Sequence, residues 1–234
     1  TTTPATLYAG IEAIDFLLAP GEKTNLVINQ REICRRQSKL HKDKKSNEVN
    51  VYYGGYLAGL SGEIAKLNFK TNIDDDYPQF IKDLKDRNAE EVKAYILNKH
   101  KEKLRQIDAL KATKACKEML CCAVDASAVS LLTFVPGIMQ RVHITNYKLK
   151  DEQVNEYIKN NPVSLPDDFL NVLRDFPSLN TPQAMYVPLY MRLTGNPMFR
   201  TAFSKALGTD KGIYFELSTV ANVLNGINDF TPVT

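Results

Sequence analysis

The segment from Gln79 to Phe134 carries apolar residues at helical spacing almost without a break. Asn88, followed three residues later by Glu91, is a capping-box pattern that marks the start of a helix. Residues 113–134 are largely apolar and are predicted to form a buried core helix. A chain of 234 residues buries a core without help from disulfides or metals. The sequence therefore predicts a mainly α-helical protein with little β structure.

Start and stop signals of helices divide the rest of the chain. Pro20-Gly21 ends a short apolar segment, and Pro136-Gly137 ends the predicted core helix. Residues 26–28 fit either a short strand or the start of a helix. Residues 49–60 fit either a short strand and turn or a tightly packed helix, and a helix from about residue 55 to residue 67 is favoured. The other predicted elements are helices over residues 7–18, 151–159 and 214–224, a short strand within residues 138–147, and helices opened by Thr181-Pro182 and Asn196-Pro197.

This pattern predicts a two-lobed helical body with a helical arm at each end. The expected divisions are an N-terminal arm (1–20), a basic lobe (21–135), a C-terminal lobe (136–207) and a C-terminal arm (208–234). A helix of about three turns is only marginally stable alone in water, so each arm needs a surface to cover its apolar stripe. That surface is either the arm's own subunit or a neighbouring one. In the second case, head-to-tail exchange builds a homo-oligomer through the terminal arms.

Positive charge is concentrated in the first two-thirds of the chain. Residues 1–150 hold 24 basic and 18 acidic side chains, whereas residues 151–234 hold 6 and 9. Three sets of cations stand out, and Lys103, Lys111 and Lys114 of the second set are expected on one helical face. The first set is Arg31, Arg35, Arg36, Lys39, Lys42, Lys44 and Lys45; the second is Lys99, Lys101, Lys103, Arg105, Lys111, Lys114 and Lys117; the third is Arg141, Lys148 and Lys150, with His143 and Tyr147 between the first two.

Such cationic sets are typical of proteins that neutralise phosphates, each contact adding salt-dependent affinity. Tyr52, Tyr53 and Tyr56 follow the first set closely and are candidates for stacking on single-stranded bases. The sequence therefore predicts an RNA-binding surface built from these cations and tyrosines. Two other interpretations stay open: a solvated helix face, and a surface for acidic proteins or lipids.

Motifs of catalysis and metal binding are missing from the sequence. The glycine-rich stretch from Gly54 to Gly62 matches neither a phosphate-binding loop nor a dinucleotide-binding fingerprint, and Ser61 lacks the G-x-S-x-G context. The three histidines are widely separated, and the run from Asp74 to Asp76 is interpreted as an acidic turn that caps a helix rather than a cation site. We therefore predict no catalytic site, no metal, no cofactor and no enzymatic activity.

Cysteine usage and hydropathy indicate the cellular compartment in which the protein is expected. Cys34, Cys116, Cys121 and Cys122 form no C-x-x-C pair, and three of them lie in the predicted core helix, so reduced core thiols are expected. An alternative is a nucleophilic pair of His143 and one of the cysteines, which are distant in sequence and would meet only in the folded protein. The apolar surroundings of the thiols argue against such a pair. No apolar run of about 20 residues exists, and no signal peptide is recognised, so a soluble intracellular protein without a membrane partner is expected.

Three stretches resemble the helical nucleocapsid proteins of segmented negative-strand RNA viruses of the bunyavirus type. They are residues 49–60, especially Gly55-Tyr56-Leu57-Ala58, residues 134–142, and residues 199–207 followed by Gly208. The resemblance implies a two-lobed helical body, a basic groove between the lobes for single-stranded RNA, and terminal arms that link subunits. A filamentous plant-virus coat protein would share this plan.

The leading hypothesis is therefore an RNA-encapsidating, self-associating nucleocapsid or coat protein of the virion and the host cytoplasm. It requires the cations between residues 31 and 150 to converge in one channel. The alternative is a helical interaction, adaptor or effector protein that uses the same arms against another protein and binds no nucleic acid. An enzyme of a kind that carries no recognisable motif is the third hypothesis.

Overall fold

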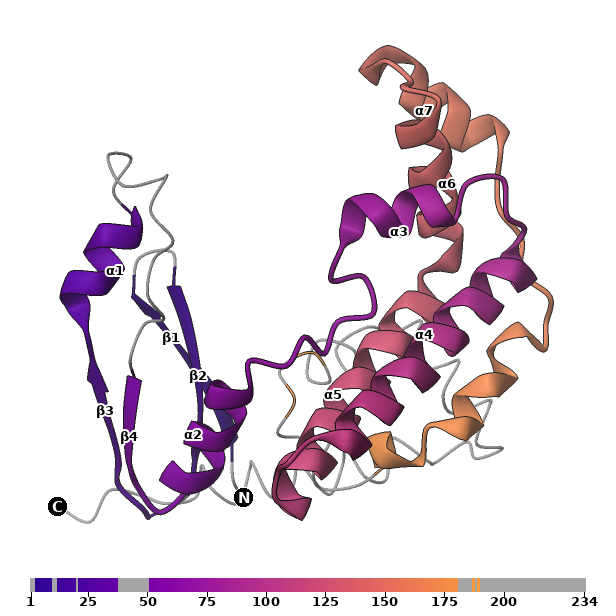
Figure 1. Ribbon diagram of the computed structural model, residues 1–234. Coiled ribbons are helices and arrows are strands. Elements are labelled where there is room, and N and C mark those ends of the chain that lie inside the picture. The colour runs from indigo at the N-terminus through magenta and orange to yellow at the C-terminus, as the bar shows by residue number, and fades with distance from the viewer. Residues whose placement is uncertain are drawn as a thin grey trace, which may run out of the picture.

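The computed structural model describes residues 3–9, 12–19, 21–37, 51–180, 187 and 189 (Figure 1). Helices dominate this part of the chain, which confirms the mainly α-helical class, and the strands form two separate two-stranded sheets. The strands are β1 (Thr3–Ala9), β2 (Glu12–Leu18), β3 (Thr24–Ile28) and β4 (Val51–Gly55). The helices are α1 (Gln30–Gln37), α2 (Ala58–Leu67), α3 (Tyr77–Asp83), α4 (Ala89–Ala109), α5 (Lys114–Thr133), α6 (Val135–Asn146) and α7 (Asp151–Asn160), and the 3-10 helices are η2 (Phe169–Asp175) and η3 (Pro177–Asn180).

The N-terminal segment is a β-hairpin, so the prediction of a helix over residues 7–18 was wrong. β1 and β2 pair antiparallel along seven residues each. Ile14 and Leu17 of β2 are buried, and the backbone N–H of Leu17 donates a hydrogen bond to Ser61 Oγ of α2 at 3.2 Å. The spacing of apolar residues in this segment is compatible with both a helix and a strand. Pairing between the two strands and packing on α2 favour the strand.

A second hairpin joins β3 to β4 and positions the tyrosines. Residues 26–28, which fitted either a strand or a helix start, lie in the strand β3. The helix predicted from about Gly55 begins at Ala58, because Gly55 is the last residue of β4. Gly55 adopts a positive φ of 103°, and a Cβ at this position would collide with the Lys23 carbonyl oxygen. Only glycine is accommodated at such a position.

The capping box predicted at the start of α4 is confirmed. Asn88 Oδ1 accepts the N–H of Glu91 at 3.0 Å, and Glu91 Oε2 accepts the N–H of Asn88 at 2.8 Å. The two bonds satisfy amide groups that a helix start otherwise leaves without partners. Val92, Ile96 and Ile107 then face the core along the same helix.

α5 is the central element of the core, as predicted for residues 113–134. Thr113 Oγ1 accepts the N–H of Cys116 at 3.3 Å and caps the helix. Val124, Ala128 and Leu132 are fully buried. α5 packs against α4, α6, α2 and both 3-10 helices, so one apolar helix serves as the common packing surface.

α5 ends at Thr133 and α6 begins at Val135 at an angle of 73°. Pro136 lies in the first turn of α6, where its missing N–H breaks no helical hydrogen bond. The short strand predicted within residues 138–147 was therefore wrong, and Ile138 and Val142 face the core at helical spacing. Within the described ranges, no single helix has the length and apolarity to cross a bilayer, and α5 and α6 meet that criterion only as this bent pair.

Two polar contacts join elements that are far apart in the sequence. The Glu63 carboxylate of α2 accepts hydrogen bonds from both the N–H and the hydroxyl of Thr113, each at 2.6 Å, and these bonds hold the pKa of Glu63 below its ordinary value. Asn146 Nδ2 of α6 donates to the Ile81 carbonyl of α3 at 3.2 Å. The first contact ties the hairpin side of the molecule to the start of α5.

The predicted division into arms and lobes stays a prediction. β2 packs against α2, and α6 packs against α3 and α4, across the first two expected boundaries. The helix predicted over residues 151–159 is confirmed as α7. The boundary at residues 207/208, the helices expected after Thr181 and Asn196, and the C-terminal arm lie outside the described residues.

Candidate functional site

Two of the three candidate tyrosines expose their rings on the β3–β4 hairpin. Tyr52 of β4 lies opposite Val27 of β3, and their exposed fractions are 68% and 64%. Tyr56, in the turn after β4, is 71% exposed. Val27 and Tyr52 share one face of the hairpin because they pair across the strands, and large exposed side chains are available to a planar partner such as a nucleobase. We call Val27, Tyr52 and Tyr56 the hairpin surface.

Tyr53 points to the other face of the same strand and has a structural contact. Its hydroxyl donates to the Asp15 carbonyl of β2 at 3.3 Å, which links the two hairpins. Burial, and secondarily the Asp15 charge, raise the pKa of Tyr53. Alternation along a strand explains the difference, because neighbouring residues face opposite sides.

The first cationic set follows β3 directly. α1 leaves the end of β3 beyond the hairpin surface, and Arg31 is exposed on it. Arg35 and Arg36 lie in α1, and their side chains are outside the described residues, as are the remaining members of the set, Lys39, Lys42, Lys44 and Lys45. The start of this window is helical, since α1 spans Gln30–Gln37.

The second set is divided, because α4 ends at Ala109 and α5 starts at Lys114. The expectation that Lys103, Lys111 and Lys114 share one helical face was therefore wrong. Lys103 Nζ donates to Asp75 Oδ2 at 2.7 Å and to the Lys70 carbonyl at 2.6 Å, and its side chain is only 12% exposed. That hydrogen bond from Lys103 is the main reason why the pKa of Asp75 lies below its ordinary value.

Other cations of this set keep their charge at the surface. Lys99 Nζ lies 3.4 Å from Glu102 Oε2, an exposed pair of small energetic weight. Arg105, Lys111 and Lys114 are exposed, and the Lys114 ammonium lies 3.8 Å from Glu118. The α4–α5 turn therefore offers a second, smaller positive surface.

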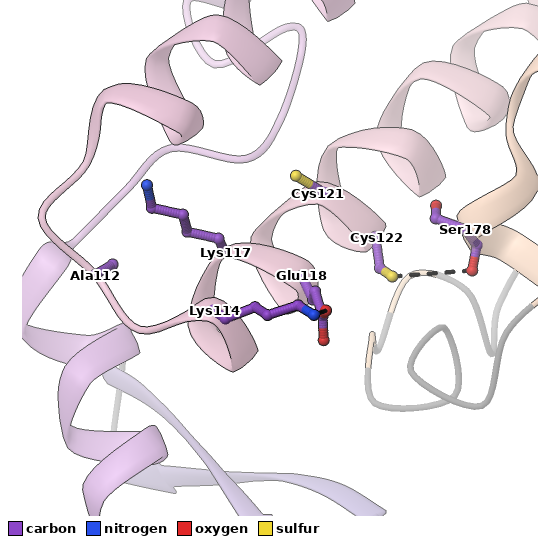
Figure 2. Close-up of a pocket in the computed structure, with 7 residues that line it drawn as sticks. All are labelled: Ala112, Lys114, Lys117, Glu118, Cys121, Cys122 and Ser178. Carbon is purple, nitrogen blue, oxygen red and sulfur yellow. Dashed lines mark hydrogen bonds and ion pairs between the residues drawn. The ribbon is translucent and has the colours of Figure 1, made fainter.

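Lys114 also borders the largest of the pockets described, with a volume of about 560 Å³ (Figure 2). Its floor includes Cys121 and Cys122, and the Cys122 thiol donates to the Ser178 carbonyl at 3.9 Å. Burial is the main cause that raises the pKa of Cys121 to about 11. A thiol with such a pKa is protonated at neutral pH and is a poor nucleophile. Cys121 is therefore not an activated nucleophile.

A buried polar chain that sequence reasoning missed crosses the core. His100 Nε2 of α4 lies 2.6 Å from Asp125 Oδ1 of α5, and the Ser178 hydroxyl of η3 donates to Asp125 Oδ2. These are the residue types of a hydrolytic triad, but the order differs: the carboxylate stands between serine and histidine. The imidazole therefore does not receive the serine proton, which the triad mechanism requires. These contacts of Asp125 hold α4 and η3 against α5.

The acidic run from Asp74 to Asp76 is likewise occupied by internal contacts. Asp76 Oδ1 accepts the N–H of Gln79 at 3.1 Å and caps α3, while Asp75 pairs with Lys103. Among the residues with described side chains, no group of three or more acidic, histidine or cysteine residues is arranged to hold a metal ion.

The third cationic set lies beside a cluster of stacked rings. His143 of α6 stacks on Tyr147 one turn later and on Tyr157 of α7, with centroid distances of 4.3 and 4.2 Å. Arg141 and Lys148 are exposed on the same part of the chain. His143 is thus placed among rings and not with a cysteine. Tyr157 is a candidate that sequence reasoning did not identify, because it comes from another helix.

The cations expected to converge are distributed over several regions. Figure 1 places α1 and α6 on opposite sides of the molecule, with α2 and α5 between them. Arg31 therefore lies apart from Arg141 and Lys148, and Lys103 is held by Asp75 in a third region. The described cations do not form one channel.

The N-terminal arm is docked on its own subunit. Ile14 and Leu17 are buried, while Leu7, Tyr8 and Leu18 remain exposed on the same hairpin. The expected C-terminal arm lies outside the described residues.

Comparison of the chain with models of protein families, with curated proteins and with solved structures gives no match.

Proposed function

We propose that this protein binds single-stranded RNA on the hairpin surface, and not in one channel formed by all the cations between residues 31 and 150, and that it associates with further copies of itself, as nucleocapsid and coat proteins do. The observation that carries the proposal is the exposure of Val27, Tyr52 and Tyr56 on one hairpin, with Val27 and Tyr52 near the end from which the basic helix α1 leaves. Stacking on such rings contributes about 1–3 kcal/mol per base and does not depend on sequence. Arg31 and the other cations of the first set supply phosphate contacts. In this role the protein belongs to the virion and the host cytoplasm.

Self-association is supported by apolar side chains that the N-terminal hairpin leaves exposed. Leu7, Tyr8 and Leu18 keep apolar surface exposed, although Ile14 and Leu17 of the same hairpin are buried. A neighbouring copy would cover this surface, and a repeated contact of this kind builds a ring or a filament.

The test is the binding of a labelled single-stranded RNA, measured by fluorescence anisotropy at low and high salt. The double variant Tyr52→Ala/Tyr56→Ala should weaken binding about tenfold or more, since about 1.4 kcal/mol corresponds to a factor of ten. Tyr77→Ala, which removes an exposed tyrosine on α3, is the matched control and should bind as the wild type does. Wild-type protein that binds no RNA at low salt would refute the proposal.

Self-association is tested separately by light scattering after size exclusion. Tyr8→Asp should shift oligomers toward the monomer, because it places a charge on the exposed hairpin side, and Tyr77→Asp should not. A wild-type monomer at high concentration, with and without RNA, would contradict this half of the proposal.

The second candidate is a helical interaction or adaptor protein that binds no nucleic acid. This candidate is favoured by the Lys103–Asp75 pair, because Lys103, a predicted phosphate contact, is bound to a carboxylate of the same protein. Reversing the charge of Arg35, Arg36 and Lys39 separates the two functions. The change should abolish RNA binding under the first proposal and leave partner binding unchanged under the second.

A further inference from the structure

A cleft of about 410 Å³ opens between the turn after α3, the end of α6, and α7 with the residues that follow it. Small-molecule sites usually occupy about 300–1,000 Å³. The segments that form the cleft are distant in sequence, because Tyr147 and Asp86 on its two sides are 61 residues apart. No part of the hairpin surface contributes to it, so it is a second, independent region of the molecule.

The aromatic wall of the cleft is a stack of three rings. The His143 and Tyr157 rings are 8° from parallel and the His143 and Tyr147 rings 25°, so His143 lies between the two tyrosines. The Tyr147 hydroxyl donates to Asp86 Oδ1 at 2.8 Å, which fixes the orientation of that ring. Tyr147 is nevertheless 51% exposed. A fixed, partly exposed end of a ring stack is suited to another planar ring.

Positive charge lies directly beside the ring stack, because the Lys85 ammonium is over the Tyr147 ring. Lys85 Nζ lies 5.6 Å from the centre of the Tyr147 ring, and its ion pair with Asp86 is long, at 4.0 Å. Arg87 lines the same cleft, with its Nε bound to the Asp83 carbonyl at 2.7 Å. A long exposed ion pair holds a lysine weakly, so Lys85 remains available to an anion.

Amide groups complete the lining of the cleft. Asn160 and Asn161 of its floor each carry an acceptor and a donor that suit the polar edge of a base. The Asn161 amide nitrogen donates to the Tyr157 carbonyl at 2.9 Å, which directs that side chain. Stacked rings, cations and amides together match the base and phosphate of a nucleotide better than an aliphatic ligand or a metal ion.

We propose that this cleft binds one nucleoside monophosphate unit, with its base on the ring stack of Tyr147, His143 and Tyr157 and its phosphate on Lys85. The unit is either a free nucleotide or one nucleotide of an RNA strand, and the chemistry of recognition is the same. The site does not depend on the hairpin surface, so variants of Tyr52 and Tyr56 leave it intact.

Isothermal titration of the full chain with adenosine monophosphate tests the site. Lys85→Glu should weaken binding about tenfold or more, because it turns the phosphate partner into a repelling charge. Lys82→Glu, an exposed lysine of α3 that does not line the cleft, is the matched control and should bind as the wild type does. Neither change touches the core, and circular dichroism checks that both variants fold.

The base contact has its own readout. With only three histidines in the chain, the proton resonances of the His143 ring are readily assigned through a His143→Gln variant, and a stacked base should shift them by its ring current. Ribose 5-phosphate, which lacks a base, should cause no such shift and should bind more weakly.

Three results would overturn the site: wild-type affinity for adenosine monophosphate weaker than about 1 mM, equal losses in Lys85→Glu and Lys82→Glu, or equal binding of ribose 5-phosphate. If an adenosine-containing single strand displaces the mononucleotide, the site serves the strand; if it does not, the site serves a free nucleotide. Displacement and the absence of displacement both support nucleotide binding in the cleft. Failure of the Tyr52→Ala/Tyr56→Ala test would not affect this proposal.

Discussion

His100 Nε2 on α4 and Asp125 Oδ1 on α5 lie 2.6 Å apart inside the helical core. Both side chains are buried, and Asp125 also accepts the Ser178 hydroxyl. The His100 ring contacts the Phe176 ring at a centroid distance of 4.9 Å. One carboxylate thus joins two helices and the segment from η2 to η3.

Removal of this carboxylate should destabilise the whole fold. Asp125→Ala deprives His100 and Ser178 of their shared acceptor, and each buried polar group left without its partner costs about 1–3 kcal/mol. Urea unfolding followed by circular dichroism measures the loss. Glu118→Ala, on the same helix but at an exposed pair with Lys114, should cost less than about 1 kcal/mol. Equal effects of the two changes would contradict the role assigned to Asp125.

Two glycines near the hairpin surface should respond to alanine in opposite directions. Gly55→Ala should lower the free energy of unfolding by about 1–3 kcal/mol, because a positive φ of 103° and the Lys23 carbonyl both oppose a side chain. Gly59→Ala should raise it by about 0.5–1 kcal/mol, since Gly59 lies in α2 with open space around it. Thermal unfolding of the two variants provides the comparison, and a stabilising Gly55→Ala would refute this reading of the turn.

The Asp75–Lys103 pair should contribute to acid sensitivity. The pKa of Asp75 is held below its ordinary value of 3.8, chiefly by the hydrogen bond from Lys103. The ionised form is therefore favoured in the folded state, so its stabilising effect is present above pH 3.8 and is lost as the pH falls through the folded pKa.

Urea midpoints of the wild type and of Asp75→Asn should therefore differ at neutral pH and converge as the pH falls below 3.8. Asp108→Asn, an exposed carboxylate at the end of α4, is the control. A difference between wild type and Asp75→Asn that does not change with pH would contradict the assignment.

Cys34 should react with thiol reagents much faster than the other three cysteines. Cys34 is exposed, whereas Cys116 and Cys122 are buried and Cys121 is half-buried. Burial is the first cause that raises the pKa of both Cys116 and Cys121 to about 11, so neither forms thiolate at neutral pH. A disulfide reagent should label one thiol quickly and the others only after denaturation. Cys34→Ser should remove the fast phase, and fast labelling that persists in this variant would refute the prediction.

Part of the candidate site was predictable from local sequence. Tyr52 and Tyr56 were selected because they follow the first cationic set, and their exposure agrees with a stacking role. Lys103 was selected by charge alone, which does not reveal that Asp75, 28 residues earlier, binds it. Lys85 and Tyr157 were missed because the cleft that unites them with Tyr147 exists only after α3, α6 and α7 have packed.

Local signals in the sequence determined the mainly helical class, the capped start of α4 at Asn88 and the buried helix α5, because caps and apolar periodicity act within a few residues of one chain segment. Tertiary structure alone decided that residues 7–18 belong to a hairpin, since their spacing suits both periods and only cross-strand pairing and packing on Ser61 of α2 favour the strand. It also decided which cations stay exposed and which, like Lys103, are bound internally, because charge is visible in a sequence whereas the partner of a charge is not.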